Sequence, residues 1–165
     1  MTTRRLLLLR HATTEGFRPG FPDRDRRLTE AGQAEAARLG DWLREQAIGV
    51  EQVLCSTAVR TRQTLAGLGL AAPAEFSDPL YGGGTDTILE ELRLLDDGIG
   101  TALLIGHAPA VPSAVHELAD PTVSDPAAVR AVARGYPPAT LSLLEFTGPW
   151  ADLTTARLVT VRLSR

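Results

Sequence analysis

Two apolar runs in this sequence end at a histidine. Leu6–Leu9 is followed directly by Arg10 and His11, and Leu103–Ile105 ends two residues before His107. Arginine offers a permanent charge and a two-pronged donor for a phosphoryl group, and a neutral imidazole can attack phosphorus or exchange a proton near neutral pH. Two buried parallel strands ending in this way would bring both histidines to one edge of a sheet, where open α/β folds bind ligands. The spacing therefore predicts an enzyme that handles phosphate.

A further arginine, Arg60, follows a third apolar stretch. We expect a buried strand over Gln52–Cys55 and a helix from about Thr57 to Leu68, with Ser56 as the N-cap. Arg60 would then lie one turn into the helix, and its side chain would lean back toward the helix N-terminus and the strand end. The helix dipole and the free N–H groups there also favour an anion. By itself Arg60 fits a solvated helix surface better, but its place after a strand, together with Arg10, His11 and His107, favours a phosphate site.

The remaining patterns alternate between strands and helices, with Ala71–Gly84 as a loop around one short strand. The other expected strands are Arg5–Arg10, Glu75–Phe76, Thr101–Ile105, Thr140–Phe146 and Ala156–Leu163. The other expected helices are Glu30–Gln46 with Thr29 as its N-cap, Asp86–Leu95, Val111–Leu118 and Asp125–Ala133. This alternation predicts an α/β fold with three layers, in which helices cover both faces of a mostly parallel central sheet.

Composition sets the broad class of protein. The 165 residues fit one domain over 1–165, and the net charge of −3 argues against a nucleic-acid partner. No apolar stretch has membrane-spanning length and no signal-type cleavage site follows the N-terminus, so we expect a cytoplasmic protein without a membrane partner. The one cysteine, Cys55, lies in an apolar stretch and is expected to be a buried, reduced thiol.

Three motifs in this order resemble the histidine phosphatase superfamily, the phosphoglycerate mutase-like enzymes: Arg10-His11, Ser56-x-x-x-Arg60-x-x-x-Thr64 and Gly106-His107. The chain is most similar to the small SixA-type phosphohistidine phosphatases. The further segments that carry this resemblance are Asp23–Thr29 with Gly32, Asp78–Gly82, Leu144–Phe146 and Trp150–Leu153.

The resemblance implies a hydrolase that needs no metal or cofactor. His11 would be the nucleophile that forms a transient phosphohistidine, and Arg10, Arg60 and His107 would surround the phosphoryl oxygens. An arginine before the Leu-Thr of the first loop would also bind phosphate. Arg26 aligns best with that position, but Arg27 replaces a usual proline, so either arginine could face the phosphate.

Besides Arg27, the sequence differs from the family pattern at the position of the general acid. Relatives that cleave phosphate esters carry a carboxylic acid after the third core strand, and here that region, Ser77–Gly84, has no glutamate. A missing acid would slow ester cleavage by about 10²- to 10⁴-fold, whereas the imidazole released from phosphohistidine can accept a proton at its other nitrogen. Glu15, Asp78 and Asp86 are the nearest substitutes, although each fits a loop or cap residue.

The leading hypothesis is thus a phosphatase acting on phosphohistidine in a partner protein. The alternatives are a phosphatase for a small phosphate ester and a non-catalytic phosphoprotein-binding module. His116 is interpreted as a structural histidine outside the site, and the three histidines lack metal-ligand spacing. Trp150, in a turn, is expected to be a capping residue or part of a protein-contact surface.

Overall fold

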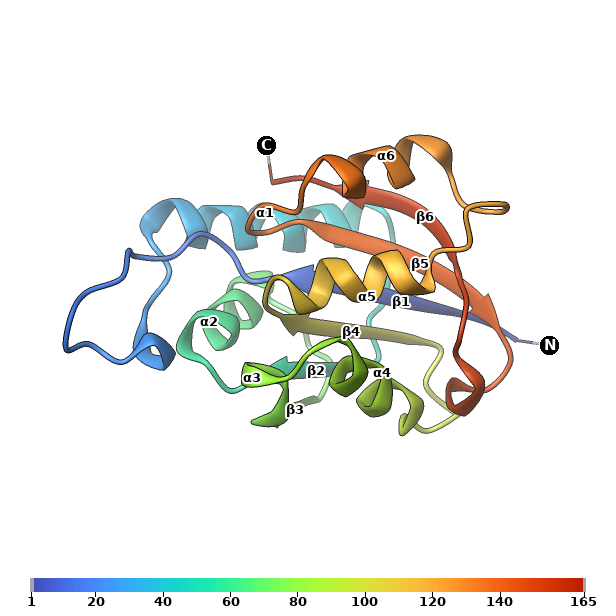
Figure 1. Cartoon of the computed structure of the whole chain (residues 1–165), viewed down its shortest axis with the longest axis horizontal. Coiled ribbons are helices and arrows are strands. Elements are labelled where there is room, and N and C mark those ends of the chain that lie inside the picture. Colours follow the sequence, from blue (N-terminus) through green and yellow to red (C-terminus); the bar gives the residue numbers. More distant parts are fainter. Residues whose placement is uncertain (1, 165) are drawn as a thin grey trace.

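A six-stranded sheet runs through the centre of the protein (Figure 1). The computed structural model describes residues 2–164. The strands, in spatial order, are β3 (Ala74–Ser77), β2 (Gln52–Ser56), β4 (Thr101–Gly106), β1 (Thr3–Arg10), β5 (Leu141–Thr147) and β6 (Arg157–Arg162). The first four are mutually parallel, and β5 is antiparallel to both of its neighbours. The sheet is therefore mostly parallel, as the sequence predicts.

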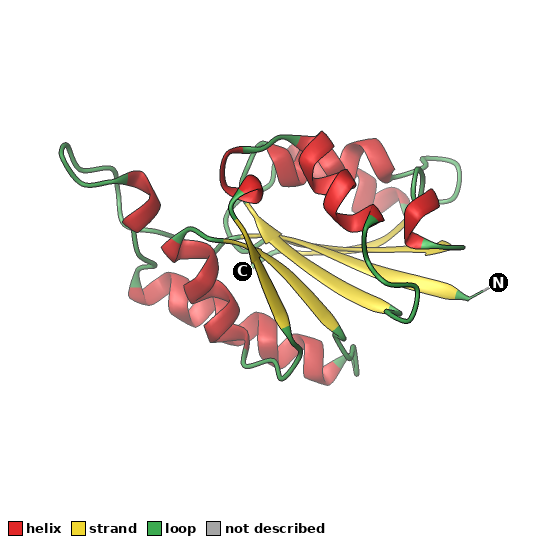
Figure 2. Ribbon diagram, turned by 90° about the horizontal axis from the view of Figure 1, so that it is seen from below, coloured by secondary structure: helices red, strands yellow, loops and turns green. Residues whose placement is uncertain are grey.

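Helices cover both faces of this sheet (Figure 2). They are α1 (Glu30–Glu45), α2 (Val59–Leu68), α3 (Pro79–Gly82), α4 (Thr85–Arg93), α5 (Ala110–Leu118) and α6 (Pro126–Arg134), with short 3-10 turns at Asp23–Asp25 and Trp150–Asp152. Side chains of α1 and α2 belong to one core cluster, and those of α4, α5 and α6 belong to another. The three-layer α/β fold is thus confirmed. None of the helices described is long and apolar enough to cross a bilayer.

The apolar run of β1 is explained by its central position. Leu6 and Leu8 lie in the core on one face, and Leu7 and Leu9 lie in the core on the other face. All four are almost completely buried. A strand covered on both faces needs apolar residues at every position rather than at alternate positions, so the run of leucines specifies a central parallel strand.

The loop after β1 is anchored against the start of α1. The Thr29 hydroxyl accepts a hydrogen bond from the Gly32 N–H at 3.0 Å, which confirms Thr29 as the N-cap. The Thr29 N–H also donates to the Thr13 carbonyl at 3.0 Å. A Cβ atom on Gly32 would lie only 2.1 Å from that same carbonyl, so glycine is required for this close approach. The helix thereby fixes the chain two residues after His11.

Three local expectations are wrong. Ser56 is the last residue of β2 and does not cap α2, which begins at Val59 with Ala58 at its N-cap position. The expected loop Ala71–Gly84 contains the short helix α3, which proline at its first position favours. Trp150 is fully buried rather than a surface or capping residue. Its indole N–H donates to the Ile99 carbonyl at 2.8 Å, and its ring packs edge-on against Phe146.

Candidate active site

Both histidines lie at the carboxyl edge of the parallel strands. β1 and β4 pair in parallel with Arg10 opposite Gly106, so the next residue of each strand is a histidine at the same edge. The His11 N–H donates to the Gly106 carbonyl at 3.0 Å, and the ring centroids of His11 and His107 are 5.4 Å apart. The structure therefore brings together the two histidines that the strand pattern singles out.

The protonation of His11 follows from its hydrogen bond. Its Nδ1 lies 2.8 Å from the Ala12 carbonyl oxygen, which can only accept, so Nδ1 carries the proton and Nε2 keeps a free electron pair. The side chain is 6% exposed. Burial, with the charges of Arg60, Arg10 and Arg26, lowers the pKa of His11 to about 4. At neutral pH this imidazole is therefore uncharged, with a nucleophilic nitrogen.

His107 is hydrogen-bonded to Ser56, which the sequence predicts as the N-cap of a helix. Its Nε2 lies 2.8 Å from the Ser56 hydroxyl, and the ring of Tyr81 meets its ring edge-on. Burial, with the charge of Arg60, lowers the pKa of His107 to about 3. Its Nδ1 is buried without a hydrogen-bond partner among the described residues. A neutral imidazole whose Nε2 accepts from Ser56 has an N–H at Nδ1 to offer to an anion.

Arg10 and Arg60 complete the group of predicted residues. An outer nitrogen of Arg10 donates to the Tyr136 carbonyl at 2.8 Å. Arg60, although 6% exposed, donates to both the carbonyl oxygen and the carboxylate of Asp23. Within residues 2–164, the Nε atoms of both arginines are buried without a partner. Buried unpaired donors of this kind suit an anion, since unsatisfied buried polar groups are costly.

Of Arg26 and Arg27, the two arginines before the Leu-Thr of the first loop, Arg26 has the partly buried side chain. Its side chain is 20% exposed and donates to Asp23, to the Thr14 hydroxyl at 3.0 Å and to the Glu15 carbonyl at 2.9 Å. Arg26 is among the charges that lower the pKa of His11. Arg27 is exposed. The geometry thus favours Arg26 as the phosphate-facing arginine.

Asp23 is the residue that sequence reasoning missed. Its carboxylate accepts hydrogen bonds from Tyr81 at 2.7 Å, from Arg26 at 2.9 Å and from Arg60 at 3.0 Å. The Tyr81 hydroxyl and the two arginines hold the pKa of Asp23 well below its usual range, so the carboxylate is ionised at neutral pH. The Asp23-x-x-Arg26 spacing, which places the two side chains one turn apart, was the available signal.

Among the described residues, none of the three carboxylates considered as a general acid hydrogen-bonds to the ring of His11 or His107. Asp78 accepts from the Thr57 hydroxyl at 2.6 Å and pairs with Arg24, and these contacts lower its pKa. Glu15 is exposed, and its backbone carbonyl is the group that Arg26 contacts. Asp86 is exposed in the first turn of α4. In contrast, the carboxylate of Asp23 contacts Arg60, and it is the side-chain carboxylate that does so among the described residues.

The structure also shows the surroundings of Cys55 and His116, two further residues discussed from the sequence. Cys55 is buried and unpaired, as expected, and burial raises the pKa of its thiol to about 12. His116 is exposed on α5, away from the two paired histidines. Within residues 2–164, no group of three or more His, Cys, Asp or Glu side chains is arranged to hold a metal ion.

Comparisons with known proteins agree with this geometry. The profile of the histidine phosphatase superfamily (branch 1) matches residues 6–80. Uncharacterized protein Rv1276c of Mycobacterium tuberculosis (strain ATCC 25618 / H37Rv) is 37% identical over 145 residues, or 88% of this chain and 91% of that protein. Phosphohistidine phosphatase SixA of Escherichia coli (strain K12) is 32% identical over 102 residues, or 58% of this chain and 63% of that protein.

Solved structures extend the likeness over almost the whole chain. A candidate phosphohistidine phosphatase SixA from Nakamurella multipartitia has a TM-score of 0.89 and 38% identity, covering 99% of this chain and 97% of that chain. A second candidate SixA, from Agrobacterium tumefaciens, has a TM-score of 0.80 and 26% identity, covering 97% and 98%. The chain belongs to the histidine phosphatase superfamily, branch 1. Within that superfamily its structure is SixA-like.

Proposed function

We propose that this protein is a phosphatase that removes the phosphoryl group from phosphohistidine in a partner protein, through a covalent intermediate on His11. The observation that carries the proposal is the buried, uncharged imidazole of His11, with a free electron pair on Nε2, beside His107 and three arginines. The SixA-like fold and the E. coli SixA relative support the same substrate class.

The reaction has two steps. In the first, His11 Nε2 attacks phosphorus while the P–N bond of the substrate breaks and its electron pair stays on the departing nitrogen. The other ring nitrogen of the leaving group takes a proton from water, so neutral imidazole leaves. In the second, water attacks the phosphorus on His11, the P–N bond to Nε2 breaks, and inorganic phosphate leaves. His11 returns to its starting state, with the proton on Nδ1 held by the Ala12 carbonyl throughout.

Arg10, Arg26, Arg60 and His107 would stabilise the transferred group. The arginines supply charge to its oxygens, and the Nδ1–H of His107 supplies a directed donor, since Nε2 is occupied by Ser56. In a site this buried, such donors act more strongly than they would in water. Arg60 and Arg26 would exchange contacts with the Asp23 carboxylate for contacts with phosphate.

The state of Asp23 favours phosphohistidine over a phosphate ester. An ester releases an alkoxide that needs a proton, and an ionised carboxylate between two arginines has none to give. Phosphohistidine releases an imidazole, which is a far weaker base than an alkoxide and can take a proton from water. The substrate that does not require an internal acid is therefore the better match.

The test is phosphate release from a phosphohistidine peptide and from a panel of small phosphate esters, in buffer containing a chelator. Wild type, His11→Ala and His116→Ala are compared, because His116 is an exposed histidine outside the site. Turnover of phosphohistidine that is lost in His11→Ala and kept in His116→Ala supports the proposal. Faster turnover of an ester would reassign the substrate, and the absence of turnover on every substrate would favour a phosphoprotein-binding module.

A further inference from the structure

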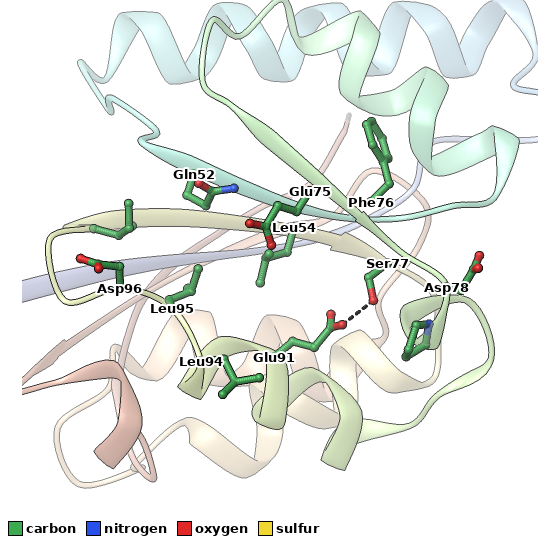
Figure 3. Close-up of a pocket in the computed structure, with 12 residues that line it drawn as sticks. Gln52, Leu54, Glu75, Phe76, Ser77, Asp78, Glu91, Leu94, Leu95 and Asp96 are labelled. Atoms are coloured by element: carbon green, nitrogen blue, oxygen red, sulfur yellow. Dashed lines mark hydrogen bonds between the residues drawn. The ribbon is translucent and has the colours of Figure 1, made fainter.

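A groove lies beside the edge strand β3, on the face of the sheet that carries α4 (Figure 3). Its volume is about 620 Å³. Leu54 of β2 and Leu95, after α4, form part of its apolar lining, and Glu75 of β3 projects over it. Phe76 points the opposite way and stacks under Arg62, with the guanidinium carbon 4.2 Å from the ring centroid.

The groove is acidic. Glu75, Glu91 and Asp96 line it, and no arginine or histidine among residues 2–164 lies within ion-pair distance of these three carboxylates. Glu91 accepts from the Ser77 hydroxyl through one oxygen, while its other oxygen is buried without a partner in the described chain. Asp78, at the end of the groove, is already paired with Arg24.

A second feature of the groove is the free edge of β3. This strand pairs with β2 on one side, and it is the last strand of the sheet on the other. An edge strand offers its unpaired backbone groups to an extended segment of another chain, and alternate side chains of that segment then point to one face. On β3 that face carries Glu75 and Ser77, which line the groove.

The groove is also continuous with the rim of the candidate active site. Asp78 directly follows β3 and bonds to Thr57 and Arg24. Tyr81, in the short helix α3 that comes next, contacts both His107 and Asp23. A segment lying along β3 therefore leads directly to the residues that surround His11.

We infer that this groove binds an extended, arginine- or lysine-bearing segment of the phosphoprotein substrate and so positions its phosphohistidine at His11; this inference rests on the proposed function. The basic side chains would meet Glu75, Glu91 and Asp96, while the backbone pairs with β3. We place the basic residues about three to eight residues from the phosphohistidine, a span of about 10–26 Å at the roughly 3.3 Å per residue of an extended chain.

The experiment compares two series of peptides that carry a single phosphohistidine. In one series two arginines stand three to eight residues before or after it, and in the other glutamines replace them. The enzymes are wild type, a groove variant with Glu75→Gln and Asp96→Asn, and a control variant with Glu45→Gln and Glu117→Gln. Both variants remove two exposed carboxylates, and those of the control lie on α1 and α5.

We expect KM for the best arginine peptide to be about 5-fold lower than for its glutamine counterpart in wild type at low salt. The groove variant should lose this difference without a change in kcat, and the control variant should keep it. Binding of the same peptides without phosphate, followed by fluorescence anisotropy, should show the same pattern.

The two readouts separate this inference from the proposed function. If wild type turns over both series equally and binds the unphosphorylated peptides equally, the groove inference is wrong and the phosphatase stands. If no peptide is dephosphorylated but the arginine peptides still bind through the groove, the proposed function is wrong and the groove stands. Equal losses in the groove and control variants would also overturn the inference.

Discussion

Asp23 holds Arg60 at two points, with its backbone carbonyl at 2.8 Å and its carboxylate at 3.0 Å. The same carboxylate takes hydrogen bonds from Arg26 and Tyr81. An anionic side chain thus occupies two of the arginines that a phosphoryl group would use. It keeps these guanidinium groups ordered, but it competes with the substrate for them.

Replacing this carboxylate should therefore tighten anion binding. In Asp23→Asn the amide keeps the shape but loses the negative charge, and we expect the inhibition constants of phosphate and tungstate to fall by about 5-fold. The measurement is competitive inhibition of phosphohistidine turnover. Asp25→Asn, an exposed change in the same 3-10 turn, is the control. A rise in the inhibition constants would show that positioning the arginines outweighs the competition.

The nucleophile prediction concerns His11. His11→Ala should reduce turnover by at least about 10³-fold, since no other group would form the covalent bond to phosphorus. Wild type quenched during turnover should carry an acid-labile phosphoryl group, detected by mass spectrometry on the peptide that contains His11. A phosphoryl group on His107 or His116 instead would assign the nucleophile elsewhere.

The low pKa values of the two histidines predict an unusual pH dependence. Burial and the nearby arginines lower the pKa of His11 to about 4 and that of His107 to about 3, so both rings stay neutral well below pH 6. We expect kcat/KM to stay level from pH 7 down to about pH 5 and to fall as pH approaches 4, as His11 gains a proton. Loss of activity centred near pH 6.5 would contradict this assignment.

The same shifts affect stability with a defined sign. Between pH 6.5, the ordinary pKa of histidine, and about 4, the unfolded chain binds protons that the folded site does not. The free energy of unfolding should therefore decrease as pH falls through this window. His11→Ala removes one such group and should flatten the decrease, which urea unfolding at a series of pH values would measure.

Ser56 should act through His107. Ser56→Ala removes the hydrogen bond to Nε2, so the ring of His107 loses the contact that orients it and that favours a proton on Nδ1 when the hydroxyl donates, and kcat should fall by about 3- to 10-fold. The nitrogen chemical shifts of His107 would report the change in tautomer, which a merely structural effect would not produce. An unchanged His107 spectrum together with lower kcat would mean that Ser56 acts in another way.

Trp150 supplies a stability prediction that is independent of the site. Trp150→Ala removes a fully buried indole and should cost about 3–5 kcal/mol of unfolding free energy. Trp150→Phe keeps an aromatic ring but loses the hydrogen bond to the Ile99 carbonyl, so it should cost less. Denaturant unfolding of both variants would check the order, and equal losses would contradict it.

The sequence was most informative where burial dictates the residue type. The all-leucine stretch of β1 predicts a strand buried on both faces, and a parallel sheet then brings His11 and His107 to one edge. Arg60 is found in the same way, because the helix that follows β2 begins beside this edge. These placements depend on short-range patterns and on the handedness of strand–helix units, both of which can be read along the chain.

Polar residues in loops were harder to place. Asp23 and Tyr81 are far apart in the sequence, and nothing in their local patterns indicates that they meet over Arg60. Ser56 resembles a helix cap, yet its hydroxyl serves His107, because the strand continues to this residue. The position of Trp150 in a turn suggests an exposed side chain, but its ring is buried and packs edge-on against Phe146.

The sequence by itself thus determined the fold and the sheet edge at which His11 and His107 lie. The tertiary structure decided the tautomer of His11, the partial burial of Arg26 against the exposure of Arg27, the contact of Asp23 with the arginines and the acidic groove beside β3. The physical reason is that a buried strand requires apolar residues that are visible in sequence. Hydrogen bonds and pKa values, in contrast, depend on which polar groups the folded chain brings within a few ångströms of one another.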